Sequence, residues 1–554
     1  MAYLDEDCLG LIFDHALAKH GMMGTVWALN RQWARWIVSK LATPAPGVRL
    51  NRQQADVLVR AVLLHENVFL SGAAGTGKSF VLRAITKLLY KQLPNFVTYA
   101  HDDPQHEYPR TVRRLMVGAP TGTAAEHCRG RTLHSLFKIG SSWQRASAPR
   151  IVYQLGRALE AELEDSESEE DASDEDDPIV KVAIIKLSDT LIAELQQLRV
   201  LVIDEISMVG REIFELIDQC LKIVKGSDRL FGGVQLLFVG DFLQLAPVCD
   251  KFCFTSPSWA AAGLRTVDLV EILRADPDQR RFMQLLGEVR FARFAPPDLD
   301  YLLSSVRTDG QGQCALFRTN DQAEATNNTY LSTLPGAEMS YTASDMVRAK
   351  PVDADGTPPI VQTWPTAVKP PKSADTEVKL KVGAVVMCTA NVNRLGGCAL
   401  SNGTQCRVRS LHQGGVRVVV LDESLCDTNR ELHIEPIAQR EETCVNDIVY
   451  YWIRTQLPLR LGFARTIHKA QGASIFVNVD IDLATPFCGQ LYVALSRVST
   501  PTLIRILNSD FRETVHKYCK AHPEALRFYE TTATTAFHPL VEHVREFVYD
   551  VRAA

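Results

Sequence analysis

The hydrophobic positions between Leu50 and about Val248 alternate between short apolar runs and helical patterns. Val68–Leu70 and Leu201–Ile203 are continuous apolar runs, and Val234–Val239 is apolar apart from Gln235; such runs are typical of strands buried on both faces of a sheet. From Phe80 to Leu89 the apolar residues recur at helical spacing instead. Strands that alternate with helices in this way predict a parallel α/β sheet, and we expect this first domain to span residues 50–265.

A second α/β region follows, from about Cys314 to Arg505, and we place its domain at 311–510. Within it, residues 345–375 are rich in Pro, Ala and Asp, which is typical of a surface insertion. Short β-type runs such as Ala384–Met387 and Val416–Val420 come next, separated by glycine turn signals. These runs predict a small β-barrel over about 376–455.

Shorter segments surround the two α/β regions. Residues 1–41 predict a helical module, and residues 42–49 contain a Pro- and Gly-bearing linker. We expect a helical connection over 266–310 and C-terminal helices over 511–554.

The charge of the chain is unevenly distributed. Residues 160–177 contain twelve Asp and Glu and no Lys or Arg, so we expect this stretch to be a disordered loop. Removing those twelve negative charges from the net charge of −5 leaves +7 for the rest of the chain. A mildly basic folded part is compatible with a nucleic-acid partner.

Other bulk properties narrow the class of protein. No apolar run is long enough to span a membrane, and the N-terminus lacks the features of a signal or transit peptide. We therefore expect a cytosolic or nuclear protein whose 13 cysteines are reduced.

Residues 72–79 fit the P-loop pattern G-x-x-x-x-G-K-[ST] and lie between the first strand and the helix that follows. Glycines there let backbone N–H groups converge on an anion, and the helix N-terminus adds its positive dipole. Lys78 is expected to reach the β- and γ-phosphates of ATP, and the Ser79 hydroxyl to bind Mg²⁺. The predicted ATP-binding residues of the loop are Gly72, Ala73, Ala74, Gly75, Thr76, Gly77, Lys78 and Ser79.

Carboxylates follow the next buried strand. Asp204 and Glu205 come directly after Leu201–Ile203, so Asp204 can hold Mg²⁺ and Glu205 can orient and deprotonate a water molecule. Gln244 follows the strand at 234–239 and can touch the γ-phosphate; an ordinary loop hydrogen bond is the alternative, and spacing alone does not choose between them.

These motifs resemble, in order, those of the Pif-type DNA helicases of helicase superfamily 1B. The resemblance extends from Leu50 to about Glu530. Its further motifs are Leu50–Gln54, Gly118–Ala125, Arg131–Phe137, Asp204–Met208, Phe231–Leu236, Gly240–Val248, Leu269–Arg274, Thr466–Gly472 and Tyr492–Val498. It implies two RecA-like domains, ATP and Mg²⁺ as cofactors, and 5′→3′ translocation on single-stranded DNA with unwinding of duplex or forked DNA.

The resemblance also implies roles for individual residues. Gln54 would contact the adenine, and Arg274 and Arg497 would act as arginine fingers on the γ-phosphate. A wedge that splits the duplex would lie between Lys138 and Gln197. The expected DNA contacts are Pro120, Thr121, Gly122, His134, Phe137, His468 and Lys469. We expect a monomer that works in DNA replication, repair, recombination or telomere maintenance, in the nucleus or a viral replication compartment.

The spacing of Leu9, Ile12, Phe13 and Trp33 in the N-terminal module resembles an F-box, which would bind a Skp-type ubiquitin-ligase adaptor. An amphipathic helical pair is the alternative. Two rival functions follow: an F-box substrate adaptor that uses its helicase core to bind DNA, and a DNA-stimulated translocase that does not unwind.

Overall fold

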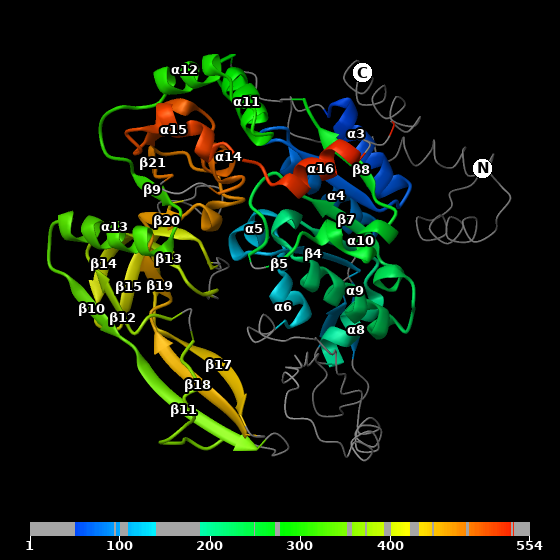
Figure 1. Ribbon diagram of the computed structural model, residues 1–554. Coiled ribbons are helices and arrows are strands. Elements are labelled where there is room, and N and C mark those ends of the chain that lie inside the picture. The colour runs from blue at the N-terminus through cyan, green and yellow to red at the C-terminus, as the bar shows by residue number, and fades with distance from the viewer. Residues whose placement is uncertain are drawn as a thin grey trace, which may run out of the picture. The chain divides into compact units, whose positions relative to one another are not determined.

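The computed structural model describes residues 50–93, 96–99, 109–112, 114–139, 189–248, 250–271, 277–351, 357–371, 374–392, 400, 402–421, 431–445, 448–483, 487–532 and 536. These residues form two compact units (Figure 1). The first unit takes in residues up to 120, residues 130–271 and the C-terminal segment from Pro523; the second takes in 121–129 and 277–522. The predicted helical module, its linker, the acidic run 160–177 and Arg274 lie outside the described residues.

A six-stranded parallel sheet forms the centre of the first unit, in the order β5-β4-β6-β7-β1-β8. Its strands are β1 (Val68–Gly72), β4 (Leu115–Ala119), β5 (Arg131–Thr132), β6 (Val200–Ile203), β7 (Gln235–Val239) and β8 (Arg265–Leu269). Every residue of β1, β4 and β6 is buried, which explains why these strands are nearly all apolar. The separate strands β2 (Phe96–Tyr99) and β3 (Pro109–Val112) form an antiparallel pair.

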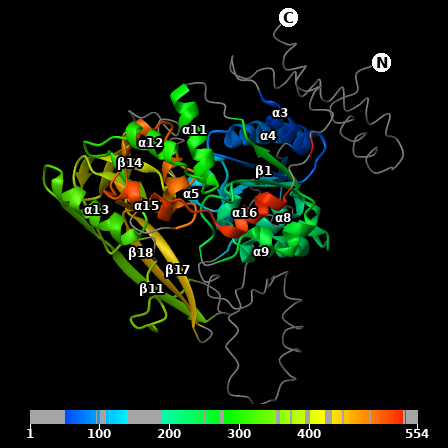
Figure 2. The ribbon, with the colours of Figure 1, turned by 45° about the horizontal axis from the view of Figure 1, so that its top comes forward.

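Helices lie on both faces of this sheet (Figure 2). The chain moves along the sheet in opposite directions after β1 and after β6, so right-handed crossovers place α4 and α9 on opposite faces. The helices of the unit are α3 (Arg52–Leu58), the π-helix η1 (Val59–Leu63), α4 (Lys78–Gln92), α6 (Leu133–Phe137), α8 (Asp189–Gln197), η3 (Ile206–Met208), α9 (Arg211–Lys225), η4 (Leu230–Gly233), η5 (Cys253–Thr255), α10 (Pro257–Ala261) and α16 (Pro523–Thr531).

Helix α9 shows how local sequence sets an element's ends. It ends at Gly226, which takes the left-handed conformation, φ 58°, that glycine adopts easily. Lys222 and Lys225 in its last turn complement the negative end of the helix dipole. The buried Asp218 accepts hydrogen bonds from the Phe231 N–H, at 2.6 Å, and from Lys222 Nζ, at 2.8 Å. Asp218 thereby fixes η4 against the helix.

An aromatic cluster fills the core of the first unit. Phe69 of β1 lies with its ring centroid 5.2 Å from that of Phe242 and 5.3 Å from that of Trp259. Phe528 of α16 joins the cluster, 5.1 Å from Phe242 and 4.6 Å from Phe254. Because aromatic side chains bury large areas, these contacts attach the C-terminal helix to the sheet that carries the P-loop.

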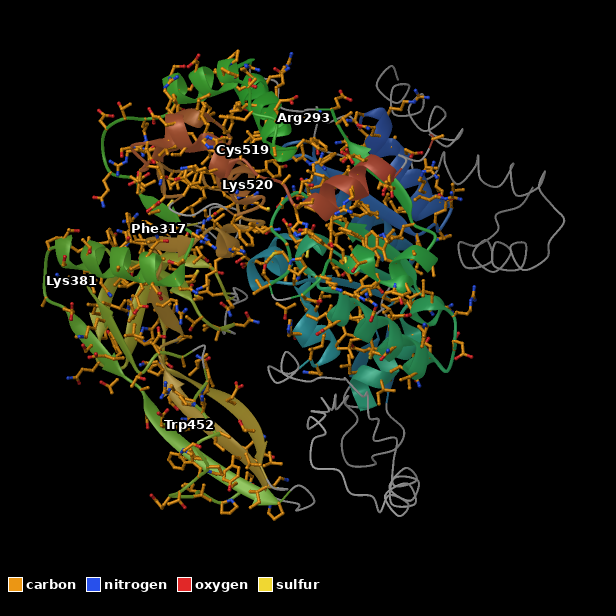
Figure 3. The ribbon with its side chains drawn as sticks, viewed as in Figure 1. Arg293, Phe317, Lys381, Trp452, Cys519 and Lys520 are labelled. Carbon is orange, nitrogen blue, oxygen red and sulfur yellow. The ribbon has the colours of Figure 1, made fainter. Side chains whose placement is uncertain are left out.

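The second unit contains a four-stranded parallel sheet in the order β20-β9-β21-β22. Its strands are β9 (Cys314–Phe317), β20 (Ala464–Thr466), β21 (Val479–Ile481) and β22 (Ile504–Ile506). Phe317 lies at the end of β9, and Cys519 follows α15 (Figure 3). The helices of this unit are α5 (Gly122–His127), α11 (Pro277–Arg290), α12 (Pro296–Ser305), α13 (Asn320–Thr333), η6 (His468–Ala470), α14 (Gln490–Leu495), η7 (Pro501–Leu503) and α15 (Phe511–Tyr518).

Antiparallel strands make up the middle of the second unit. Five of them form a sheet in the order β16-β15-β14-β13-β19, and β10 pairs with β12. A single core contains residues from both sets, including Tyr341, Leu380, Val386 and Val418. The strands are β10 (Met339–Thr342), β12 (Glu377–Leu380), β13 (Val385–Cys388), β14 (Gln405–His412), β15 (Gly415–Val420), β16 (Glu431–Ile434) and β19 (Leu459–Leu461). They occupy most of the region expected to form a small β-barrel.

The structure differs from the sequence expectation at 345–375. Part of this predicted surface insertion is strand β11 (Ser344–Pro351), which pairs with β18 (Ile448–Gln456) next to β17 (Ile437–Val445). The three strands form a ribbon that projects from the rest of the unit and carries Trp452 (Figures 1 and 3). The polar composition of β11 hid the strand, since Asp345 forms an ion pair with the buried Arg454 at 2.6 Å.

Over the part of the chain that the structure describes, no helix combines the length and the apolar character needed to cross a membrane.

Candidate nucleotide-binding site and nucleic-acid contacts

The predicted P-loop connects the end of β1 to the start of α4 in the first unit. Gly75 and Gly77 have φ of 82° and 91°, values that residues with a Cβ rarely adopt. Gly72 has φ 149°, and a Cβ there would lie 2.7 Å from Thr76 Oγ1 and 2.8 Å from the Leu269 carbonyl oxygen. The loop therefore needs glycine at these three positions for backbone geometry and for space.

Polar contacts within the loop hold it in a compact turn. Lys78 Nζ donates to the Gly72 carbonyl at 2.6 Å and to the Ala73 carbonyl at 3.1 Å. The buried Thr76 donates from Oγ1 to the same Ala73 carbonyl at 2.9 Å. Lys78 thus lies over the loop it belongs to, while Ser79 at the start of α4 is exposed.

Asp204 and Glu205 follow β6 at the carboxyl edge of the same sheet, where the strand order places β7 between β6 and β1. Burial raises the pKa of the Asp204 carboxyl to about 7, and the charge of Glu205 adds to the rise. The Glu205 N–H, 2.9 Å from Asp204 Oδ1, and the positive charge of Lys78 lower that pKa. Lys78 therefore lies close enough to Asp204 for its positive charge to favour the ionised carboxylate.

Glu205 has an unusual backbone conformation. Its φ of 50° and ψ of 44° are left-handed, and it lies just before η3. A residue other than glycine in this region costs of order 1–3 kcal/mol, and such strain is concentrated at functional sites. The strained residue is the second carboxylate of the predicted Asp-Glu pair.

Gln244 lies in the turn after β7 and is 5% exposed. Its N–H donates to the Asp241 carbonyl at 3.0 Å. Its side-chain Oε1 is buried and has no hydrogen-bond partner among the described residues. An unpaired buried acceptor is costly, so this atom is suited to a donor outside the chain. The sequence left an ordinary loop hydrogen bond as the alternative role for Gln244. The structure contains such a bond, but the backbone N–H of Gln244 makes it and the side-chain Oε1 does not.

Gln54 is fully buried next to the P-loop. Its Oε1 accepts from the Asn51 N–H at 3.1 Å, which completes a capping box at the start of α3. Its Nε2 donates to the Thr76 carbonyl at 3.3 Å. Gln54 therefore joins α3 to the P-loop, and its predicted contact with the adenine stays a prediction.

Of the two predicted arginine fingers, the structure describes Arg497, in the second unit after α14. Arg497 is 8% exposed. Its Nε donates to the Val493 carbonyl at 2.8 Å, and one terminal nitrogen donates to the Ala473 carbonyl at 3.1 Å. A further bond from the same nitrogen to the Ala470 carbonyl, at 3.4 Å, joins the guanidinium to the predicted motif at 466–472.

The predicted DNA contacts fall in both units. Pro120 follows β4, and Thr121 caps α5 by accepting the Ala124 N–H at 3.2 Å, so Gly122 is the first residue of that helix. His134 is exposed on α6, whereas the side chain of Phe137 is fully buried. Phe137 is thus a core residue, and we withdraw its side chain as a DNA contact. Phe137 was predicted as a contact because it lies in a motif that resembles a DNA-contacting one, but its side chain is fully buried.

His468 and Lys469 lie in η6 of the second unit, and Lys469 is exposed. Burial, and then the positive charge of Arg318, lower the pKa of His468. The His468 ring lies 5.9 Å from the ring of Phe487, which has the Arg318 guanidinium 5.7 Å from its centroid. Phe487 lies outside every motif identified in the sequence.

Comparison with known proteins decides the family. A family profile described as PIF1-like helicase matches residues 173–285, which include β6, β7 and β8. The ATP-dependent DNA helicase PIF1 of Rattus norvegicus is 31% identical over 530 residues, which cover 94% of this chain and 69% of that protein. This chain belongs to the PIF1-like helicase family.

Two further comparisons extend over most of this PIF1-like chain. The ATP-dependent DNA helicase PIF1 of Xenopus laevis is 32% identical over 492 residues, 87% of this chain and 64% of that protein. The chain therefore spans just under two thirds of the length of the first curated relatives that it matches. The crystal structure of the Pif1 helicase from Candida albicans superposes with a TM-score of 0.64 at 25% identity, covering 88% of this chain and 100% of that one. The α/β fold expected from the sequence is confirmed.

Proposed function

We propose that this PIF1-like chain is an ATP-dependent DNA helicase that moves 5′→3′ along single-stranded DNA and unwinds duplex or forked DNA. The observation that carries the proposal is the grouping of Lys78, Asp204, Glu205 and Gln244 at the carboxyl edge of one parallel sheet. The names of the family's relatives, ATP-dependent DNA helicases, support it.

The residues present suit a nucleotide and Mg²⁺. The loop has two glycines in left-handed conformations, which turn backbone N–H groups toward one anion, and an ammonium group. Ser79 and Asp204 offer the hydroxyl and carboxylate oxygens that Mg²⁺ prefers. Mg²⁺ bound there would neutralise charge on the phosphates. The buried Gln244 Oε1, without a partner in the described chain, suits a donor such as the attacking water molecule.

Each residue then has a definite role. Lys78 exchanges the carbonyls of Gly72 and Ala73 for phosphate oxygens, because a charged acceptor makes the stronger bond. Glu205 takes the proton of the water that attacks the γ-phosphate. Gln244 orients that water, and Gln54 supports the loop and contacts the adenine.

Arginines complete the hydrolytic site in this proposal. Arg497, and Arg274 from outside the described residues, supply positive charge to the γ-phosphate as hydrolysis proceeds. Because Arg497 belongs to the second unit, the proposed hydrolysis would depend on residues of both units.

The DNA track is proposed to use Pro120, Thr121, Gly122, His134, His468 and Lys469. Thr121 and Gly122 lie at the N-terminal end of α5, where backbone N–H groups suit a phosphate, and Lys469 adds a cation. We also propose the domain assignment given by the sequence, a monomeric state, and nuclear or viral replication compartments as the site of action. The F-box module and its Skp-type partner stay predictions for residues 1–41.

ATP hydrolysis with and without single-stranded DNA tests the proposal. We expect DNA to stimulate hydrolysis by the unaltered chain. Lys78→Ala and Glu205→Gln should each reduce the stimulated rate about a hundredfold or more, since each removes an interaction that the transition state needs. Hydrolysis that is absent, or indifferent to DNA, would reject the motor and favour the adaptor function.

A further inference from the structure

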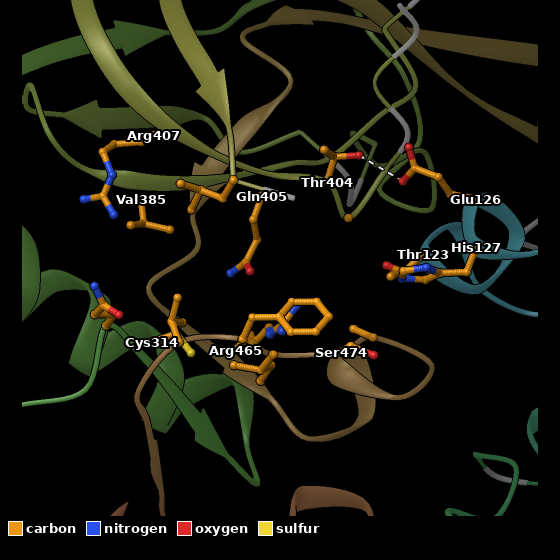
Figure 4. Close-up of a pocket in the computed structure, with 17 residues that line it drawn as sticks. Thr123, Glu126, His127, Cys314, Val385, Thr404, Gln405, Arg407, Arg465 and Ser474 are labelled. Atoms are coloured by element: carbon orange, nitrogen blue, oxygen red, sulfur yellow. Dashed lines mark hydrogen bonds between the residues drawn. The ribbon is translucent and has the colours of Figure 1, made fainter. Parts of the chain in front are cut away.

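A pocket of about 160 Å³ lies within the second unit, next to β14, β20 and the segment 473–477 (Figure 4). Its polar lining residues include Gln313, Thr404, Gln405, Arg407, Arg465 and Ser474. None of them belongs to the P-loop or its carboxylates, so the proposed hydrolysis does not use this pocket.

Arg465 is the unusual residue of the pocket. It lies on β20 and is 5% exposed. Within the described part of the chain its guanidinium has no ion-pair or hydrogen-bond partner, and its Nε is a buried donor without an acceptor. Burial lowers the pKa of Arg465, and the charge of Arg497 lowers it further. Arg465 is therefore a buried cation with a second cation nearby.

The lining includes one negatively charged side chain, and among the described residues Arg465 forms no ion pair with it. The carboxylate among the lining residues is that of Glu126, whose Oε2 accepts the Thr404 hydroxyl at 3.1 Å. An arginine stays charged in a protein, and a buried charge without a counter-ion costs several kcal/mol. A second guanidinium, Arg407 of β14, lines the same pocket. Two guanidinium groups with hydroxyl and amide donors are the usual ligands of an oxyanion.

We propose that this pocket binds a phosphate-sized oxyanion through Arg465 and Arg407. Its volume equals that of about five water molecules at roughly 30 Å³ each, which is enough for such an anion. The phosphate can come from free inorganic phosphate or from a nucleic-acid backbone, and the tests below distinguish these sources.

Thermal unfolding of the full chain in inorganic phosphate, at constant ionic strength with chloride, tests the site. All proteins carry Lys78→Ala, which weakens phosphate binding by the P-loop. We expect phosphate to raise the Tm, and the further change Arg465→Met to abolish that rise. Arg465→Lys should keep part of it, because the charge is retained. Arg407→Met should weaken it, which provides a second variant if Arg465→Met does not fold. Equal phosphate-dependent shifts with and without Arg465 would overturn the proposal.

The salt dependence of single-stranded DNA binding separates the two sources. If a backbone phosphate occupies the pocket, Arg465→Met should lower the slope of log K against log salt by about 0.7, as for one lost phosphate contact. If free phosphate is the ligand, the slope should stay unchanged while the phosphate effect on Tm is lost. Either result supports an oxyanion site, and the absence of both effects rejects it.

The hydroxyl of Tyr529 carries a second and independent inference. It lies 2.6 Å from Ser71 Oγ, accepts the Phe242 N–H at 3.2 Å and donates to Asp241 Oδ1 at 3.2 Å. Ser71 and Asp241 are fully buried. Three segments far apart in the sequence, β1, the turn after β7 and α16, thus meet at one oxygen.

Two of these segments carry the proposed hydrolytic residues. Ser71 directly precedes Gly72 of the P-loop, and the Asp241 carbonyl accepts the N–H of Gln244. Phe528 holds α16 in place through the aromatic core. We infer that Tyr529 is a positioning residue that fixes the Gln244 turn relative to the P-loop. This inference rests on the proposed function.

Tyr529→Phe removes the hydroxyl and keeps the ring. We expect the kcat of DNA-stimulated hydrolysis to fall about tenfold, while KM for ATP stays within about twofold, because orientation rather than binding is lost. The matched control is Tyr341→Phe, which removes a hydroxyl that donates to the His412 carbonyl at 3.0 Å in the second unit.

An unchanged kcat in Tyr529→Phe, or equal losses in both variants, would reject the inference. Failure of the proposed function is distinguishable, since the unaltered chain would then show no DNA-stimulated hydrolysis.

Discussion

At the scale of one residue, Glu205 departs from the backbone conformation that its residue type prefers. A glutamate at φ 50° is strained, and its carboxylate lies next to that of Asp204, whose pKa it raises. Nothing in the pattern of Leu201–Ile203 predicts the left-handed turn that follows, although the Asp-Glu pair itself is legible in the sequence. The sequence therefore predicted a carboxylate at this position, but it did not predict the left-handed backbone that carries it.

Replacing Glu205 tests this strain. Glu205→Gly should be more stable than Glu205→Gln by roughly 1 kcal/mol, since both remove the charge and only glycine relieves the left-handed backbone. Chemical denaturation of the two variants measures the difference. A glycine variant less stable than the glutamine variant would contradict the account.

His468 provides a prediction for pH. The pKa of His468 is lowered in the folded state, so folding favours the neutral ring. As the pH falls below the unfolded-state pKa of about 6.5, the unfolded chain takes up a proton first, and the folded state loses stability. The free energy of unfolding should therefore decrease less between pH 7.5 and pH 5.5 in His468→Gln than in the unaltered chain. Equal decreases would show that His468 is not held neutral.

At the scale of elements, the sequence predicted the buried strands well and the polar ones poorly. The runs at 68–70 and 201–203 lie within β1 and β6, and the run at 234–239 contains β7, because strands buried on both faces are mostly apolar. Strand β11 was missed because it contains the charged Asp345, whose partner Arg454 lies more than a hundred residues away in the sequence. The contact of Tyr529 with the P-loop strand was missed for the same reason, since long-range partners leave no local pattern.

The P-loop and α11 offer a matched pair of glycine substitutions. Gly72→Ala should destabilise the fold and abolish ATP binding, because its Cβ would lie under 3 Å from Thr76 Oγ1 and from the Leu269 carbonyl. Gly287→Ala, in α11 with open space around it, should stabilise the chain by up to about 1 kcal/mol. Thermal unfolding and nucleotide titration measure both. A tolerated Gly72→Ala would show that the turn is not constrained as described.

At the scale of the whole molecule, the first unit holds the P-loop, both carboxylates and Gln244, and the second holds Arg497, His468 and Lys469. Neither unit contains all the groups that the proposed motor needs, so the proposed function requires both units. Membership of the PIF1-like family agrees with it, and the motifs made that family legible from the sequence.

Strand displacement tests the central claim most directly. The substrate is a labelled DNA fork with a single-stranded 5′ tail, compared with a duplex that has only a 3′ tail. We predict ATP-dependent release of the labelled strand from the 5′-tailed substrate and none from the 3′-tailed one, with Lys78→Ala inactive on both. DNA-stimulated ATP hydrolysis without any strand release, or release only from the 3′-tailed substrate, would contradict the account.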